Sequence, residues 1–318
     1  MGVFCDFRLQ IKLLQNYLSL SFFSDQFFDE VHHLTIMNPN EIISHIEPKK
    51  KWLDVDLKGL WRYRDLYLMY IKRDIVTQYK QTVLGPLWYL IQPLLTTIMY
   101  MFVFGTLAGI GTDGIPQPLF YMAGITLWNY FSTCFTSCSD VFGVNAGVFG
   151  KVYFPRLVVP LSACTSNLIR MLIQLGLFVA IYIYYVVSGQ FSPALSFSLL
   201  SFPILILMLG LHSMAWGLLF SSWTTKYRDL KFLIQFGIQL FMYATPVIYP
   251  LSFAPESYRW IINLNPLTPI FEAFKYSCLG AGTFDIFGLS YSFIVLCVTM
   301  FFAVIIFNRT EQRFMDTV

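Results

Sequence analysis

Charged residues are scarce in this sequence, and their scarcity excludes most water-soluble folds. Only 12% of the 318 residues are Asp, Glu, Lys or Arg, whereas 56% are apolar. An average soluble domain carries about 25% charged and about 45–50% apolar residues. So few charges cannot cover the surface of a soluble globule of this length. A net charge of +3 is also too small to indicate nucleic-acid binding. The composition therefore indicates a membrane protein.

The sequence also lacks the common signatures of metal and nucleotide sites. Its six cysteines form no CxxC pair, which favours small buried apolar residues over a zinc site or a disulfide framework. Gly150-Lys151 looks like the end of a P-loop, but Asn145 and Val152 stand where GxxxxGK[ST] requires Gly and then Ser or Thr. We therefore expect no enzyme, no ATP site and no cofactor in this chain.

Long stretches without charge predict the membrane spans. A helix needs about 20 residues to cross the hydrocarbon core, and a charge near the bilayer centre costs about 2.5–3.5 kcal/mol. Five charge-free windows are long enough, and the one of 55 residues, 171–225, is divided by the turn sequence Gly189–Pro193. The fold class expected is an all-α membrane protein with six transmembrane helices. The approximate spans are 87–107, 118–139, 168–187, 195–221, 231–249 and 286–307.

The distribution of Lys and Arg predicts the orientation. Residues 1–80 hold 11 of the 21 basic residues, and the predicted outer loop from Gly109 to Pro118 holds none. By the positive-inside rule both termini are cytosolic, which agrees with an even number of spans. Residues 1–57 are then a cytosolic leader, and Met37 is an alternative start to Met1, in which case 1–36 would be an artefact of the gene model.

Two segments outside the spans have their own predicted structures. Residues 58–85 place apolar side chains at helical spacing among basic ones, a pattern typical of an amphipathic helix in the cytosolic interface. The four prolines and many apolar residues of 249–284 predict short re-entrant helices between spans five and six. Residues 86–318 would then form the transmembrane domain.

Three predicted spans carry uncharged polar side chains on one face. Residues four apart stack on the same side of a helix, and polar groups in hydrocarbon need partners, so we expect these faces to point inward. Such stripes can join helices by hydrogen bonds or line a water-accessible passage; three together favour a passage for a neutral polar cargo. The residues are Tyr89, Gln92, Thr96 and Tyr100 in span one, Asn129, Thr133 and Ser137 in span two, and Gln235, Gln239 and Tyr243 in span five.

Ionisable residues are almost absent from the membrane interior. Only His212 is deep, and a lone histidine is more often satisfied within a helix bundle, while Arg170 stands where span three begins and can extend to the cytosol. Ion-driven transporters need proton or ion relays, so energy is expected from another subunit. Two alternatives remain: an ion-driven secondary transporter or channel, and a membrane-bound glycan-assembly enzyme.

Several long blocks of sequence resemble a known family. They are YRDLYLMYIKRDIVTQYKQTVLGPLWYLIQP from Tyr63, KVYFPRLVVPLSA from Lys151, KYRDLKF from Lys226, TPVIYP from Thr245 and LNPLTPIFEAFKY from Leu264. With them, the chain resembles the permease subunits of ABC-2-type exporters of bacterial surface polysaccharides: O-antigen, capsule and teichoic acid. Arg170 departs from the family pattern, which has an acidic or neutral residue there.

The resemblance implies a mechanism and partners. It implies a homodimer of six-span subunits in the cytoplasmic (inner) membrane, joined to a separate ABC-type ATPase that binds ATP and Mg. The cargo implied is a polysaccharide on a polyprenyl diphosphate lipid, leaving through spans one, two and five. The same resemblance assigns contact with the ATPase to two segments, represented by Asp65, Arg73, Asp74, Lys151, Tyr153, Phe154, Pro155 and Arg156.

Overall fold

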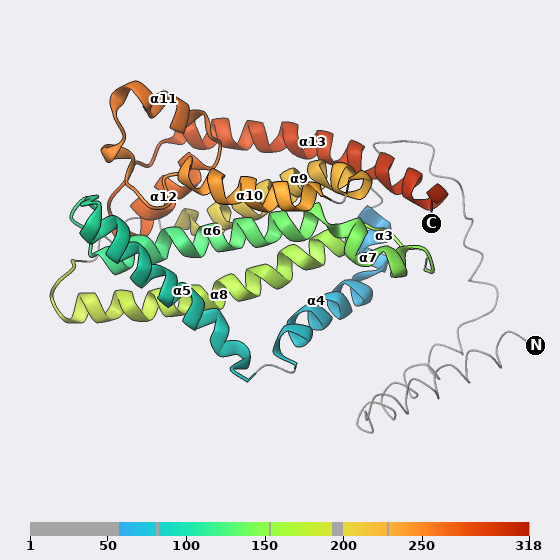
Figure 1. Cartoon of the computed structure of the whole chain (residues 1–318), viewed down its shortest axis with the longest axis horizontal. Helices are drawn as coiled ribbons and strands as arrows, with labels where there is room; N and C mark the ends of the chain where they lie inside the picture. The colour runs from blue at the N-terminus through green and yellow to red at the C-terminus, as the bar shows by residue number, and fades with distance from the viewer. Residues whose placement is uncertain (1–56, 81–82, 153, 193–199, 228, 318) are drawn as a thin grey trace, which may run out of the picture. The chain divides into compact units, whose positions relative to one another are not determined.

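The computed structural model describes residues 57–80, 83–152, 154–192, 200–227 and 229–317, which all belong to one unit of the chain, Lys51–Val318 (Figure 1). The leader before Leu57, with the alternative start at Met37, and Tyr153 lie outside these residues. Within them every regular element is helical, as the sequence predicts. The α-helices are α3 (Leu57–Arg62), α4 (Arg64–Tyr79), α5 (Trp88–Tyr100), α6 (Gln117–Ser139), α7 (Val141–Phe149), α8 (Val158–Val187), α9 (Phe202–Lys226), α10 (Leu230–Tyr243), α11 (Glu256–Leu264), α12 (Thr268–Leu279) and α13 (Ile286–Thr317).

Four helical segments in the described residues are long and apolar enough to cross a membrane. They are Gly85–Leu107, Val158–Val187, Phe202–Lys226 and Ile286–Gln312. They correspond to predicted spans one, three, four and six. The other two predicted spans are helical but do not meet both criteria. α6 has 23 residues and lies inside the bundle, and α10 has 14, which is about 21 Å of helix.

The first span is not a regular α-helix throughout. α5 contains Pro93, which removes one backbone hydrogen bond, and it continues into a wider π-helical turn over Met101–Leu107. The segment predicted as one helix over 58–85 divides into α3 and α4, separated at Tyr63. A 3₁₀ turn over Gly85–Leu87 then connects to α5, with Gly85 at a φ of 49°. Figure 1 shows α4 and α5 diverging from this connection.

α6 is the central helix of the bundle, packed against α5, α8, α9, α10 and α12 (Figure 1). Its contact with α9 is close because α9 has glycine there. A Cβ on Gly217 would lie 2.5 Å from Cys138 Cβ and 2.8 Å from the Phe135 carbonyl oxygen. Small residues at helix contacts let backbones approach, which is how membrane helices gain packing energy where the surrounding lipid is as apolar as they are. α6 therefore depends on Gly217 for its position.

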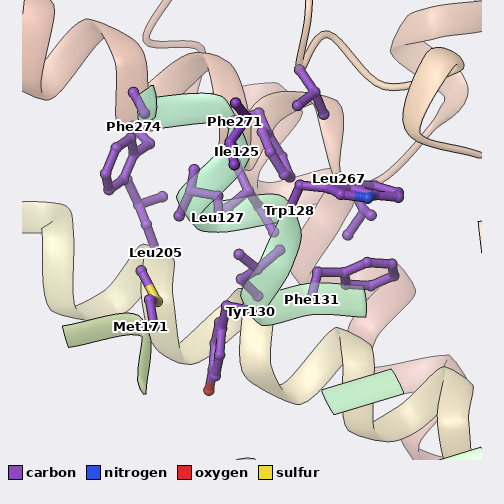
Figure 2. Close-up of a cluster of buried hydrophobic side chains, with 14 of the residues drawn as sticks. Ile125, Leu127, Trp128, Tyr130, Phe131, Met171, Leu205, Leu267, Phe271 and Phe274 are labelled. Carbon is purple, nitrogen blue, oxygen red and sulfur yellow. The ribbon is translucent and has the colours of Figure 1, made fainter. Parts of the chain in front are cut away.

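The main apolar core joins α6 to the helices around it. Figure 2 shows Trp128 and Phe131 of α6 beside Phe271 of α12, with the Trp128 and Phe131 ring centroids 5.4 Å apart. Met171 of α8 and Leu205 of α9 close another side of this cluster. The predicted role of the cysteines is visible here too, since Cys134 and Cys138 are fully buried and free.

His212 lies in this interior as well. Its side chain is fully buried in α9, and Nδ1 is 3.0 Å from the Met208 carbonyl oxygen of the same helix. The prediction that this histidine is satisfied within the bundle holds for Nδ1, whereas Nε2 is buried without a hydrogen-bond partner among the described residues.

The segment between α10 and α13 contains two short helices. α11 presents large apolar side chains outward, whereas α12 is buried against α6, α9 and α13. The predicted pairing of Glu272 with Lys275 is confirmed: Lys275 Nζ lies 3.5 Å from Glu272 Oε1, and both side chains are under 5% exposed. Lys275 also donates to the Pro246 carbonyl oxygen and sits 4.3 Å from the centroid of the Phe120 ring. Lys275 thus joins α12 to the segment after α10 and to the start of α6.

Candidate functional site

The three predicted polar stripes lie on helices that contact one another. α6 packs against both α5 and α10, and the Tyr100 hydroxyl of α5 donates to Met242 Sδ of α10 at 3.7 Å. The inner side of α5 is formed by Pro93 and Thr97, which are buried against the bundle. The stripes face away from that interior.

Most stripe residues are open on the surface of the single chain. Those that are exposed are Gln92, Thr133, Ser137, Gln235, Gln239 and Tyr243, and those that are half-buried are Tyr89, Thr96, Tyr100 and Asn129. We call this set the polar face. Two of its half-buried side chains contact other helices: Tyr100 bonds to Met242 of α10, and the Tyr89 ring lies 5.7 Å from the Arg170 guanidinium of α8. The exposed members point away from the rest of the chain.

Hydrogen bonding divides the polar face into two kinds of side chain. The hydroxyls are satisfied by their own helices: Thr96 donates to the Gln92 carbonyl oxygen at 2.9 Å, and Thr133 to the Asn129 carbonyl oxygen at 2.6 Å. The amides of Gln235 and Gln239 make no hydrogen bond to any described residue. An amide left unpaired in an apolar medium costs several kcal/mol, so this face needs water, a polar cargo or a second protein surface.

The other side of α10 is different in character. An apolar groove of about 340 Å³ lies between α6, α9 and α10, lined by Phe131, Trp216, Ile234, Ile238 and Phe241 among others. The outward side of α10 carries the two amides among exposed apolar side chains, including Phe232, Phe236 and Leu240.

The two segments assigned to ATPase contact are brought together by an aromatic cluster. Tyr70 of α4 and Phe154 have ring centroids 6.2 Å apart, and Phe154 lies 5.8 Å from Phe149 of α7. The cluster continues from Phe142 to Phe307 of α13, with 5.0 Å between ring centroids. Burial raises the pKa of the Tyr70 hydroxyl above its usual value. These ring contacts would therefore transmit a displacement of either segment to the other segment and to α13.

Individual residues of these segments differ in exposure. Asp65 and Lys151 are exposed and available to a partner. Phe154 and Arg156 are buried, and Arg156 donates to the Glu311 carbonyl oxygen at 3.1 Å while its guanidinium lies over the Phe149 ring. Pro155 is half-buried. In this chain Phe154 and Arg156 hold the loop against α7 and α13.

Arg73 and Asp74 lie at a polar pocket that sequence patterns did not reveal. Arg73 Nη2 pairs with Asp74 Oδ1 at 2.8 Å, and both line a pocket between α4, α6, α7 and α8. Asp140 and Arg170 line it too, and Asp140 Oδ1 pairs with Lys231 Nζ at 2.6 Å. The signal in the sequence was Arg170, a charge at the start of a predicted span.

The fold and the polar face define an all-helical integral membrane protein with a surface prepared for a polar partner or cargo. Residues 65–279 match the family described as ABC-2 type transporter, and the chain belongs to that family. It is 29% identical over 258 residues to the O-antigen export system permease protein RfbA of Klebsiella pneumoniae, covering 79% of this chain and 94% of that protein. The RfbA protein of Myxococcus xanthus is 27% identical over 222 residues, 69% of this chain and 82% of the relative. The polysialic acid transport protein KpsM of Escherichia coli is 21% identical over 251 residues, 77% and 93% of the two chains.

Proposed function

We propose that this chain is the permease subunit of an ATP-driven exporter that moves a polysaccharide, such as O-antigen, across the cytoplasmic membrane. The observation that carries the proposal is the polar face, which places uncharged amides and hydroxyls on the outside of α5, α6 and α10. A glycan offers hydroxyls along its whole length and requires neutral partners that bind and release without strong attachment. The relatives named for O-antigen export and for polysialic acid transport support a polysaccharide as the class of cargo.

The polar face also supports a homodimer. A passage needs walls on all sides, and one chain supplies a single outward-facing wall. Two copies related by a two-fold axis would present the same face to each other and enclose the passage between them. In this arrangement α6 and α10 act as the second and fifth of six spans, and α11 and α12 form the re-entrant segment that closes the outer mouth.

The energy would come from a separate ABC-type ATPase, which would bind ATP and Mg. Exposed Asp65 and Lys151 stand on the two segments that the aromatic cluster connects, so both are candidates for contact with that partner. Motion imposed on α4 or the 151–156 loop would pass through Tyr70, Phe154 and Phe307 to the spans. Coupling between distinct sites requires a packed connection of this kind.

The test is transport by the reconstituted complex. The chain is purified with its ABC-type ATPase partner and placed in proteoliposomes with a lipid-linked glycan, which is then probed from the outer side with a lectin. We expect the glycan to become accessible only with ATP and both subunits. Transport by the chain alone under an ion gradient would establish a secondary transporter instead, and new glycan made from nucleotide sugars by the lone chain would establish an assembly enzyme.

A further inference from the structure

The polar pocket between α4, α6, α7 and α8 has a volume of about 510 Å³ and is lined by Arg73, Ser137, Asp140, Asn145, Asn167 and Arg170 among others. It is built from four helices, so its lining is held by the bundle. Ser137 belongs to both the pocket and the polar face. The pocket therefore opens where the α6 stripe meets the helix α4 that precedes the first span.

The charges around the pocket leave one arginine without a counterion. Asp74 is paired with Arg73 at 2.8 Å, and Asp140 is paired with Lys231 at 2.6 Å. Among the described residues, no carboxylate oxygen lies within 4.0 Å of the Arg170 guanidinium. Arg170 Nη1 donates to the neutral Asn167 Oδ1 at 2.8 Å, and its guanidinium lies 5.7 Å from the centroid of the Tyr89 ring.

The guanidinium of Arg170 also keeps unused donors. Its Nε is buried and has no hydrogen-bond acceptor among the described residues. Arginine presents five donors in a planar fork that matches the oxygens of a phosphate, and a buried donor without a partner is costly. Arg73 on the opposite helix is already paired with Asp74, so Arg170 is the arginine of the lining that has no carboxylate partner among the described residues.

We propose that this pocket binds the phosphate group of a lipid-linked glycan at the start of the translocation path, with Arg170 as its main contact. The proposal rests on the proposed function, because it assigns the pocket to the exported cargo. A phosphate joins the neutral sugars to an apolar lipid, so it is the one strongly charged part of such a substrate. The pocket supplies the matching charge beside the neutral polar face.

The proposal is tested by binding to the complete complex of the chain with its ATPase in phosphatidylcholine nanodiscs. The probe is farnesyl diphosphate, with farnesol as the uncharged match and inorganic pyrophosphate as competitor. We expect Arg170→Gln to weaken binding of farnesyl diphosphate by about tenfold or more, and Arg64→Gln, an exposed arginine on the same helix as Arg73, to leave it unchanged. Pyrophosphate should compete, and farnesol should bind weakly to every variant.

Ser137→Phe provides an independent variant, because it fills the pocket from an exposed position and leaves Arg170 in place. It should weaken binding as Arg170→Gln does. Wild-type affinity in either variant, equal binding of farnesol, or failure of pyrophosphate to compete would overturn the proposal. So would complete displacement by phosphatidylglycerol in the nanodisc, since the pocket would then belong to bulk headgroups. If the variants lose binding but still export the glycan, the pocket is not the phosphate site of the exporter and the proposed function stands. If the wild-type complex binds the probe but shows no ATP-dependent export, the proposed function is wrong.

Discussion

At the scale of residues, two amides on α10 and one buried ion pair in α12 are the polar groups whose surroundings most affect export and stability. Gln235 and Gln239 stand exposed on α10 without a hydrogen-bond partner among the described residues, while Lys275 and Glu272 satisfy each other in the interior. The two glutamine amides are stable in the membrane only beside water, a polar cargo or a polar protein surface. The buried ion pair is stable only while both of its members are present. Each situation leads to a measurable expectation.

Replacing both Gln235 and Gln239 with Leu should abolish export at a normal protein level in the membrane. Leucine keeps the helix propensity of α10 and removes the groups that exchange hydrogen bonds with a cargo. Export is measured by surface staining of the glycan. Gln190→Leu, in the exposed turn after α8, is the matched control and should export normally. Normal export by the double variant would mean that these amides serve packing.

Lys275→Met should destabilise the protein by about 3–5 kcal/mol, because it leaves a buried carboxylate without its cation. Burial already raises the pKa of the Glu272 carboxyl, which shows the cost of ionising it there. The melting temperature in detergent measures the effect, and the double change with Glu272→Gln should recover most of it. Glu256→Gln, in an exposed pair with Arg259, should leave the melting temperature unchanged. Equal losses in the single and double variants would contradict the argument.

At the scale of elements, an ion pair beside α7 joins the end of α6 to the start of α10. The Asp140–Lys231 pair spans from the end of α6 to the start of α10, and α7 passes over it at Gly143. A Cβ at position 143 would lie 2.9 Å from Lys231 Nζ and collide with the Asp140 carboxylate. The absence of a side chain at Gly143 therefore permits the pair, which connects the segment near the ATPase contacts to the polar face.

Asp140→Asn and Gly143→Ala should each lower the ATPase rate that accompanies export, without a large loss of stability. The pair is partly exposed, so it contributes about 1 kcal/mol or less to folding, and its effect should lie in coupling. The swapped variant Asp140→Lys with Lys231→Asp should restore part of the coupled rate. Coupled ATPase activity that is unchanged in both single variants would remove this contact from the transmission path.

The limits of sequence reasoning are visible in the same elements. Charge-free windows located the first, third, fourth and sixth spans because hydrocarbon excludes charge. They placed the third near 168, whereas α8 begins at Val158 and continues through Arg170. A window rule assumes that every charge lies at a helix end, and here Arg170 is accommodated inside the helix by Asn167 and the pocket. The pocket itself required four helices to meet, which no local pattern records.

At the scale of the whole molecule, the sequence predicts that the polar stripes point into the bundle, and this direction is wrong for the single chain, where most of their side chains are exposed. Helical spacing shows that Thr133 and Ser137 share a face, yet it does not say whether the face points into the bundle or out of it. Gly217 and the buried residues of α12 decide that, by fixing how α6 packs against α9 and the outer segment. Tertiary contacts of this kind are invisible to periodicity.

The predicted topology gives an expectation for the intact protein in cells. A green fluorescent protein fused after Val318 should be fluorescent, and alkaline phosphatase fused there should be inactive, because basic residues keep the C-terminus in the cytosol. A phosphatase fused within the Gly109–Pro118 loop should be active and serves as the control for expression. Active phosphatase at the C-terminus would reverse the orientation or change the number of spans.

The outward direction of the polar face also bears on the life of a newly made copy. A solitary subunit would expose bare amides to acyl chains, and its α10 is short for the thickness of the bilayer. Such orphan subunits are natural targets for membrane proteases that survey unassembled proteins. The cellular half-life of this chain should therefore increase with the concentration of the subunits that cover those amides on assembly. Degradation of unassembled copies would then limit the membrane to assembled complexes.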